Sequence, residues 1–186
     1  PVLLMSGGRS WLIVQSTAAT GTGLGAWLDT VYQVSNGRVK PVATYLARVN
    51  QSGFYPLPSK VFVGSPVSCE IKDRQVILTV SYRVEYGDYS SDKVPLFTRQ
   101  QTAVLRGSLK NGSAVLDVGT SEVAPGEFES IYNFDSMGPD QFVKYNYAEL
   151  RAIANSDNAE RKKWLKEFLA TCRNTRMKRE LSALLK

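Results

Sequence analysis

Residues 75–86, with the sequence QVILTVSYRVEY, decide the larger part of the fold. Apolar or aromatic side chains occupy every second position from Val76 to Tyr86, and most positions between them are polar. Because successive side chains of a β-strand point to opposite faces, this period of two is typical of an antiparallel strand with one buried face. The stretch therefore predicts a strand that covers a hydrophobic core.

Similar short apolar runs surround this stretch and are separated by turn residues. We expect strands over residues 10–17, 26–35, 38–46, 61–63, 67–72, 75–86, 96–106 and 114–118. Asn-Gly pairs at Asn36 and Asn111 favour tight hairpins, because a type I′ turn needs positive φ at both central positions. Asp73 and Arg74 lie at a third such position. No long helix separates these strands, so an antiparallel sheet is predicted rather than a parallel one.

The spacing of apolar residues changes near Pro139, from two to three or four. Such spacing is typical of amphipathic helices, and three stripes can be followed to the end of the chain. The stripes are Val143, Tyr147, Leu150 and Ala154; Leu165, Phe168, Leu169 and Cys172, with Trp164 beside them; and Met177, Leu181, Leu184 and Leu185. Pro139 with Asp140, Asp157 with Glu160, and Asn174 are the expected helix starts.

These patterns together predict an α+β protein. We expect an antiparallel β-sheet or sandwich of about seven to eight strands over residues 10–120, followed by a cluster of three helices over residues 139–186. The predicted domain is single and covers residues 1–186, with a β-rich part at 1–126 and a helical part at 127–186 packed on an open face of the sheet. Residues 127–134 are predicted to form a short helix or an aromatic strand.

The composition excludes several kinds of active site. The chain of 186 residues has no histidine and two cysteines, so catalytic triads with histidine and four-thiolate zinc sites cannot be assembled from it. Catalysis by carboxylates alone stays open as an alternative, namely a glycosidase-like hydrolase. The carboxylates on or between the predicted strands are Asp29, Glu70, Asp73, Glu85, Asp88 and Asp92. We expect no metal and no cofactor, and we favour a protein that is not an enzyme.

Two loops are the candidate ligand contacts. Gly21, Gly23 and Gly25 follow a predicted strand and favour a turn or bulge, where a backbone without side chains allows a ligand to approach closely. The pattern lacks the features of a nucleotide-binding loop. Phe54 and Tyr55 lie in a second loop, and aromatic side chains there are suited to a sugar, a peptide or a lipid-like ligand.

Positive charge is concentrated in the predicted helices. From Asp140 onward there are eleven Lys or Arg residues against six Asp or Glu, within a net charge of +6 for the whole chain. Arg161, Lys162, Lys163 and Lys166 are the candidate contacts with an anionic surface. The alternative interpretation is the solvated face of amphipathic helices, and nucleic acid is an unlikely partner because no nucleic-acid motif accompanies the charge.

Cys69 and Cys172 are both predicted to point inward. They either form a disulfide between sheet and helices or remain two separate buried thiols. The sequence begins at Pro1, which is explained by a removed signal peptide, a shortened chain or a cleaved tag. We expect a secreted or periplasmic protein, with a cytoplasmic one as the alternative. No run approaches the roughly 18 apolar residues of a spanning helix, so we do not expect an integral membrane protein.

The function predicted from the sequence is therefore a non-enzymatic, extracytoplasmic module that binds a small molecule, a peptide or a protein. The alternatives are the carboxylate-dependent hydrolase and binding of nucleic acid or an anionic surface through the basic helices. The sequence leaves the ligand and the oligomeric state open.

Overall fold

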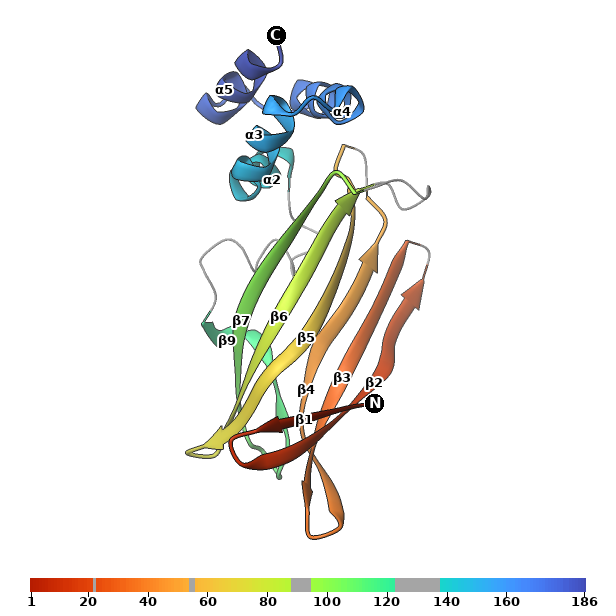
Figure 1. Ribbon diagram of the computed structural model, residues 1–186, viewed down its shortest axis with the longest axis vertical. Coiled ribbons are helices and arrows are strands. Elements are labelled where there is room, and N and C mark those ends of the chain that lie inside the picture. The colour runs from red at the N-terminus through yellow and green to blue at the C-terminus, as the bar shows by residue number, and fades with distance from the viewer. Residues whose placement is uncertain (22, 54–55, 88–94, 123–137) are drawn as a thin grey trace.

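A computed structural model describes residues 1–21, 23–53, 56–87, 95–122 and 138–186. Over these ranges the chain forms an elongated nine-stranded sheet with a helical cluster at one end (Figure 1). The strands are β1 (Val2–Ser6), β2 (Arg9–Gly21), β3 (Leu24–Ser35), β4 (Arg38–Gln51), β5 (Ser59–Lys72), β6 (Gln75–Gly87), β7 (Phe97–Ser108), β8 (Ala114–Val115) and β9 (Asp117–Glu122). The helices are α2 (Pro139–Tyr145), α3 (Tyr147–Asn155), α4 (Ala159–Ala170) and α5 (Arg176–Leu184). The predicted α+β class, with an antiparallel sheet before a helical cluster, is confirmed.

The sheet is an antiparallel meander that closes on itself at β4. Strands β1 to β7 follow one another in order, and β9 pairs with β7. One edge of β4 pairs with β3 along its whole length, so the other edge is the one that pairs with β5 and β8. On that edge, β8 pairs in parallel at Ala43 and Thr44, and β5 pairs at Arg48–Gln51. Since β8 also lies against Gly107 of β7, β4 to β8 enclose a common interior.

The predicted hairpin turns are present, with the backbone that their residues favour. Asn36 and Gly37 have φ values of 50° and 71° between β3 and β4. Asp73 and Arg74 have φ values of 49° and 61° between β5 and β6. Both central residues of each turn are thus left-handed, as a type I′ turn requires. Asn111 and Gly112 turn the chain too, but the β8 that follows pairs with β4 rather than with β7.

Strand β5 differs most from the prediction, which split it into two short strands. It runs unbroken through Gly64 and Pro66, with a register shift between Pro66 and Ser68. Strand β4 pairs with β5 only as far as Val63. Pro66 therefore lies beyond this pairing, where its lack of an N–H costs no hydrogen bond to β4. Strand β1 was not predicted at all, and its Ser6 hydroxyl accepts a hydrogen bond of 3.1 Å from the Cys69 N–H.

The core lies inside the curved sheet and continues into the helices. The largest side chains with almost no exposed surface are Trp11, Tyr45, Tyr82, Phe62, Phe142, Leu78, Leu105, Leu150, Leu165 and Leu181. In β6 the alternation seen in the sequence is fully realised, because Val76 and every second residue to Tyr86 are buried. Tyr82 covers Gly64 of the neighbouring strand, where a Cβ atom would lie 2.5 Å from the Tyr82 Cε1 atom.

Residues 138–186 form four helices instead of the three predicted there, because the first one breaks at Asn146. This residue is fully buried, and its Nδ2 donates to the Phe142 carbonyl at 3.0 Å. Two helix starts also differ by one residue from the prediction. Asn158 rather than Asp157 caps α4, and Thr175 rather than Asn174 caps α5, each accepting a backbone N–H three residues later. Pro139 begins α2 as predicted.

The helices contact the end of the β6–β7 hairpin instead of an open face of the sheet. Phe142 of α2 packs against Tyr86 and Phe97, with ring centroids 5.3 and 6.1 Å apart. Arg161 of α4 donates a hydrogen bond of 2.8 Å to the Pro95 carbonyl. Figure 1 shows the cluster above the ends of these strands.

Arg99 of β7 connects the sheet to two helices. Its guanidinium donates to the Tyr145 carbonyl at 3.0 Å and to Asn146 Oδ1 at 3.2 Å, and it pairs with Glu149 at 3.1 Å. The Arg99 side chain is only 12% exposed, so these interactions are poorly screened by water.

The residues 123–137 before α2, including the predicted element at 127–134, lie outside the described residues.

We predict that Arg99→Met lowers the free energy of unfolding by about 2 to 3 kcal/mol, because Asn146 and Glu149 lose a buried charged donor. Denaturant titration monitored by circular dichroism measures this change. Arg38→Met, at an exposed position on β4, is the matched control and is expected to change it by less than about 0.5 kcal/mol. Equal effects of the two substitutions would contradict the role of Arg99.

Candidate functional site

Five neighbouring strands present a continuous row of side chains on the outer face of the sheet. The row consists of Trp27, Arg48, Val63, Arg83 and Gln100. Each residue is directly paired with the next across β3, β4, β5, β6 and β7. Directly paired residues point to the same face, and the alternating neighbours in β5 and β6 are buried in the core. The row therefore faces away from the core.

A groove of about 440 Å³ lies along this row. Its lining residues are Val61, Val63, Ser65, Ser81, Arg83, Glu85 and Gln100. The pairing of β4 with β5 ends at Val63, so the two strands part at the point where the groove lies. The volume falls within the range of about 300 to 1,000 Å³ that is usual for ligand sites.

An aromatic side chain and a cation extend this surface beyond the groove. The Arg48 guanidinium carbon lies 5.0 Å from the centroid of the Trp27 ring, in a cation–π contact. Arg48 Nε also donates to Asn50 Oδ1 at 3.3 Å. The indole lies over Gly25, where a Cβ atom would be only 2.7 Å from Trp27 Cη2. Gly25 thus provides space for the Trp27 ring.

The groove has mixed polarity and little net charge. Arg83 and Glu85 form an ion pair on β6, and the Arg83 side chain is 63% exposed. Ser65, Ser81 and Gln100 add hydroxyl and amide groups that both donate and accept hydrogen bonds. Val61 and Val63 of β5 add apolar surface and are paired directly with Glu85 and Arg83 of β6.

The predicted glycine turn lies beside the start of the predicted aromatic loop. The Gly23 carbonyl accepts a hydrogen bond of 2.7 Å from the Ser52 N–H, and Gly23 has a φ of +82°. Gly21 is paired with Leu24 at the end of β2. Phe54 and Tyr55 themselves lie outside the described residues, so their part as ligand contacts stays a prediction.

The four predicted basic contacts do not share one role. Arg161 donates to the Pro95 carbonyl, two residues before β7 begins. Lys163 is exposed and Lys162 is half-buried, whereas Lys166 lines a groove between α4 and α5. No helix among the described residues is long and apolar enough to cross a bilayer.

The predicted carboxylates are dispersed in the described part of the chain. Asp29 is buried and accepts a hydrogen bond of 3.0 Å from the Tyr45 hydroxyl, and burial raises the pKa of this carboxyl against the opposing effect of hydrogen bonds from Tyr45 and Gln15. Glu70 and Asp73 are exposed.

Glu85 is the sole acidic residue among those that line the outer groove. Asp88 and Asp92 lie outside the described residues. The described ranges contain no group of three acidic or cysteine side chains suited to a metal ion.

The disulfide that the sequence allows is not formed, and both cysteines are buried free thiols. Cys69 is paired with Leu78, whereas the helices meet β6 at Tyr86, eight residues further along that strand. At about 3.3 Å per residue this separation is about 26 Å, far beyond the roughly 7 Å limit between bridged Cα atoms. Burial, with a smaller contribution from Glu70, raises the pKa of Cys69 to about 12.

Lys60 of β5 is buried, with 7% of its surface exposed, near the end of the sheet that the helices cover. Burial lowers the pKa of its ammonium group from 10.5 to about 7. In antiparallel register, Lys60 lies directly opposite Tyr86, which contacts Phe142 of α2. The position of this lysine was not identified from the sequence, because it precedes a run that was predicted to be a short edge strand.

Comparisons with protein-family models, with curated protein sequences and with solved structures find no match to this chain.

We predict that Gly25→Ala lowers the free energy of unfolding by about 1 to 2 kcal/mol, because its Cβ atom displaces the Trp27 ring. Gly21→Ala is the matched control, since a Cβ atom there meets nothing within 4 Å. Urea titration with tryptophan fluorescence measures both variants. A Gly25→Ala variant as stable as the control would contradict the packing of Trp27 on Gly25.

We also predict a pH dependence that comes from Lys60. Its folded-state pKa of about 7 is below the unfolded value of 10.5, so the unfolded chain binds more protons between these two values. The free energy of unfolding therefore rises with pH in this window, by up to about 1.4 kcal/mol per pH unit. Lys60→Met removes this contribution, and urea titrations between pH ~6 and ~9 measure the difference in slope. Identical slopes for the two proteins would contradict the burial of a titrating ammonium group.

Proposed function

We propose that this chain is a non-enzymatic binding module that holds an oligosaccharide in the groove on the outer face of β5, β6 and β7. The observation that carries the proposal is the row from Trp27 to Gln100, which borders a groove of about 440 Å³. We further propose that the module acts in an extracytoplasmic compartment, secreted or periplasmic, where glycans are exposed on cell surfaces and matrices.

The chemistry of a sugar matches the side chains along this row. Sugar hydroxyls donate and accept hydrogen bonds, and Ser65, Ser81 and Gln100 do the same. The paired charges of Arg83 and Glu85 offer strong donors and acceptors without a large net charge. The C–H face of a sugar ring is apolar and suits Val61 and Val63 of the groove or the ring of Trp27.

Binding without hydrolysis is supported by the carboxylates. Most glycosidases use two carboxyl groups about 5 to 9.5 Å apart, one on each side of the scissile bond. Of the residues that line the groove, Glu85 alone carries a carboxyl group, and it is paired with Arg83. The residues that line the groove therefore lack the second carboxyl group that this chemistry needs.

Screening of the intact chain against an immobilised panel of neutral and acidic oligosaccharides identifies the ligand, and calorimetry measures its affinity. We predict that Arg83→Ala weakens binding at least tenfold, because a charge-assisted donor is lost from the groove. Gln100→Ala is expected to weaken binding less, because it removes a neutral amide. Arg38→Ala, which removes an exposed arginine from the turn end of β4, is the control and leaves affinity unchanged.

Two results would contradict the proposal. One is an absence of binding to every oligosaccharide of the panel by a protein whose unfolding transition is intact. The other is binding that Arg83→Ala and Arg38→Ala weaken equally, since a general loss of positive charge would then explain it. Oligosaccharide recovered uncleaved after incubation is the expected outcome, and its cleavage would favour the hydrolase alternative.

A further inference from the structure

A second groove, of about 470 Å³, lies between α4 and α5. Leu169, Ala170 and Leu185 form its apolar part, and Lys166, Lys178 and Lys186 surround them. The α4 residues are three and four positions apart, so they share one face of that helix. The groove thus combines apolar residues of α4 and of the end of α5 at Leu185 with three lysines.

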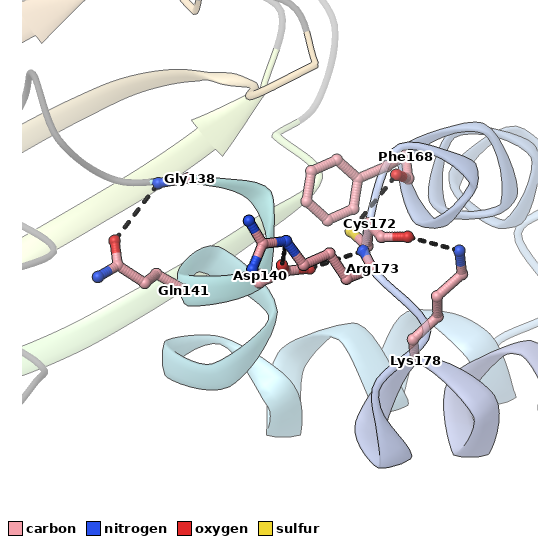
Figure 2. Close-up of polar contacts among 7 residues, drawn as sticks. All are labelled: Gly138, Asp140, Gln141, Phe168, Cys172, Arg173 and Lys178. Carbon is pink, nitrogen blue, oxygen red and sulfur yellow. Dashed lines mark hydrogen bonds and ion pairs between the residues drawn. The ribbon is translucent and has the colours of Figure 1, made fainter.

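The walls of this groove are held by specific contacts. Lys178 Nζ of α5 donates to the Cys172 carbonyl, just beyond α4, at 2.7 Å (Figure 2). The neighbouring Arg173 N–H donates to Asp140 Oδ1 of α2 at 2.9 Å. Figure 2 shows these contacts joining the start of α2, the segment after α4 and the first turn of α5. The groove is therefore formed by packed elements that are joined to one another.

The charge along this groove is unbalanced. None of the residues that line it is acidic, whereas three are lysines. Glu180 of α5 is already engaged by the Tyr147 hydroxyl at 2.6 Å and by Arg176 at 2.8 Å, on another face of the helix. Among the side chains that line the groove, an anionic group would thus meet an excess of positive charge.

We propose that the α4/α5 groove binds a single-chain anionic amphiphile, namely a long-chain carboxylate. The acyl chain lies along Ala170 and Leu185, over the almost fully buried Leu169, and the carboxylate is bound by Lys166 and Lys186. Lys178 contributes positive charge while its contact with Cys172 fixes its position. This site is separate from the outer groove of the sheet and does not depend on the proposed oligosaccharide binding.

The observations favour this occupant over a macromolecule. A groove of about 470 Å³ is suited to one small ligand, whereas a stable protein partner covers about 800 Å² on each side. Nucleic acid would be bound by charges alone and would gain nothing from the apolar residues of the groove. A bilayer would require an exposed apolar helix face rather than a recess between two helices.

Calorimetry with dodecanoate below its micelle concentration tests the site in the full chain. Dodecanoate is expected to bind, and decyl maltoside, which has a neutral head group, at least tenfold more weakly. Ala170→Trp fills the groove without changing charge and is expected to abolish binding. Lys166→Glu is expected to weaken binding at least tenfold.

Matched controls separate these effects from general ones. Ala152→Trp places the same large residue at an exposed position of α3, and Lys144→Glu makes the same charge change on α2. Both are expected to bind dodecanoate as the unmodified chain does. Thermal unfolding followed by circular dichroism establishes that each variant is folded before it is titrated.

Three outcomes would overturn the proposal. Dodecanoate binding that Ala170→Trp leaves unchanged would place the ligand elsewhere. Equal binding of decyl maltoside would remove the part assigned to the lysines. Sedimentation with phosphatidylglycerol vesicles, without any binding of dodecanoate below its micelle concentration, would identify a bilayer surface as the partner instead. Oligosaccharide binding is expected to be the same in Ala170→Trp, so failure here is distinguishable from failure of the proposed function.

Discussion

The short pairing between β4 and β5 is the constraint on which the rest of the structure depends. Only Arg48–Gln51 of β4 pair with β5, and the same edge of β4 then pairs with β8 at Ala43 and Thr44. Two strands that part after four residues cannot form a flat sheet, so β5, β6 and β7 curve away from β4. The curvature encloses the core residues on one face and leaves the groove on the other.

The capped end of the sheet shows how the two parts of the chain are joined. Hydrophobic contact comes from Phe142 against Tyr86 and Phe97, and polar contact from Arg99. Arg99 occupies an inward-facing position of β7 but finds its partners on α2 and α3, beyond the end of the hairpin. The interior positions of a strand can therefore be polar where the sheet ends and another element begins, which explains this charge on the inward face of β7.

Local patterns were sufficient to predict most elements. The alternation in β6, the turn residues at Asn36 and Asp73, and Pro139 at the first helix start each act through the backbone of their own segment. The prediction ended one strand at residue 63 and began the next at residue 67, because local spacing does not show that β4 is absent beside Pro66, which is a property of the fold. The break at Asn146 likewise depends on burial and on Arg99, forty-seven residues earlier in the chain.

The candidate site could be predicted only in part for the same reason. The polar positions Ser81, Arg83 and Glu85 were correctly assigned to one face of their strand, opposite the apolar face. To predict that they lie beside Trp27, Arg48 and Gln100, one must know the register of four strand pairs. The local spacing of residues does not specify this register. The glycine turn was identified from the sequence, but the reason for Gly25 became apparent only from the position of the Trp27 ring above it.

A ligand site in the outer groove of the sheet is tested most directly by mapping the chemical shifts of the backbone amides. An NMR titration of the isotope-labelled chain with its best oligosaccharide is expected to move the amides of β5, β6 and β7 around Val63, Arg83 and Gln100, and those near Trp27. The chemical shifts of the backbone amides near Val76, at the far end of β6, are expected to stay unchanged. Shifts confined to the helices, or spread evenly over the chain, would contradict a ligand site on this face of the sheet.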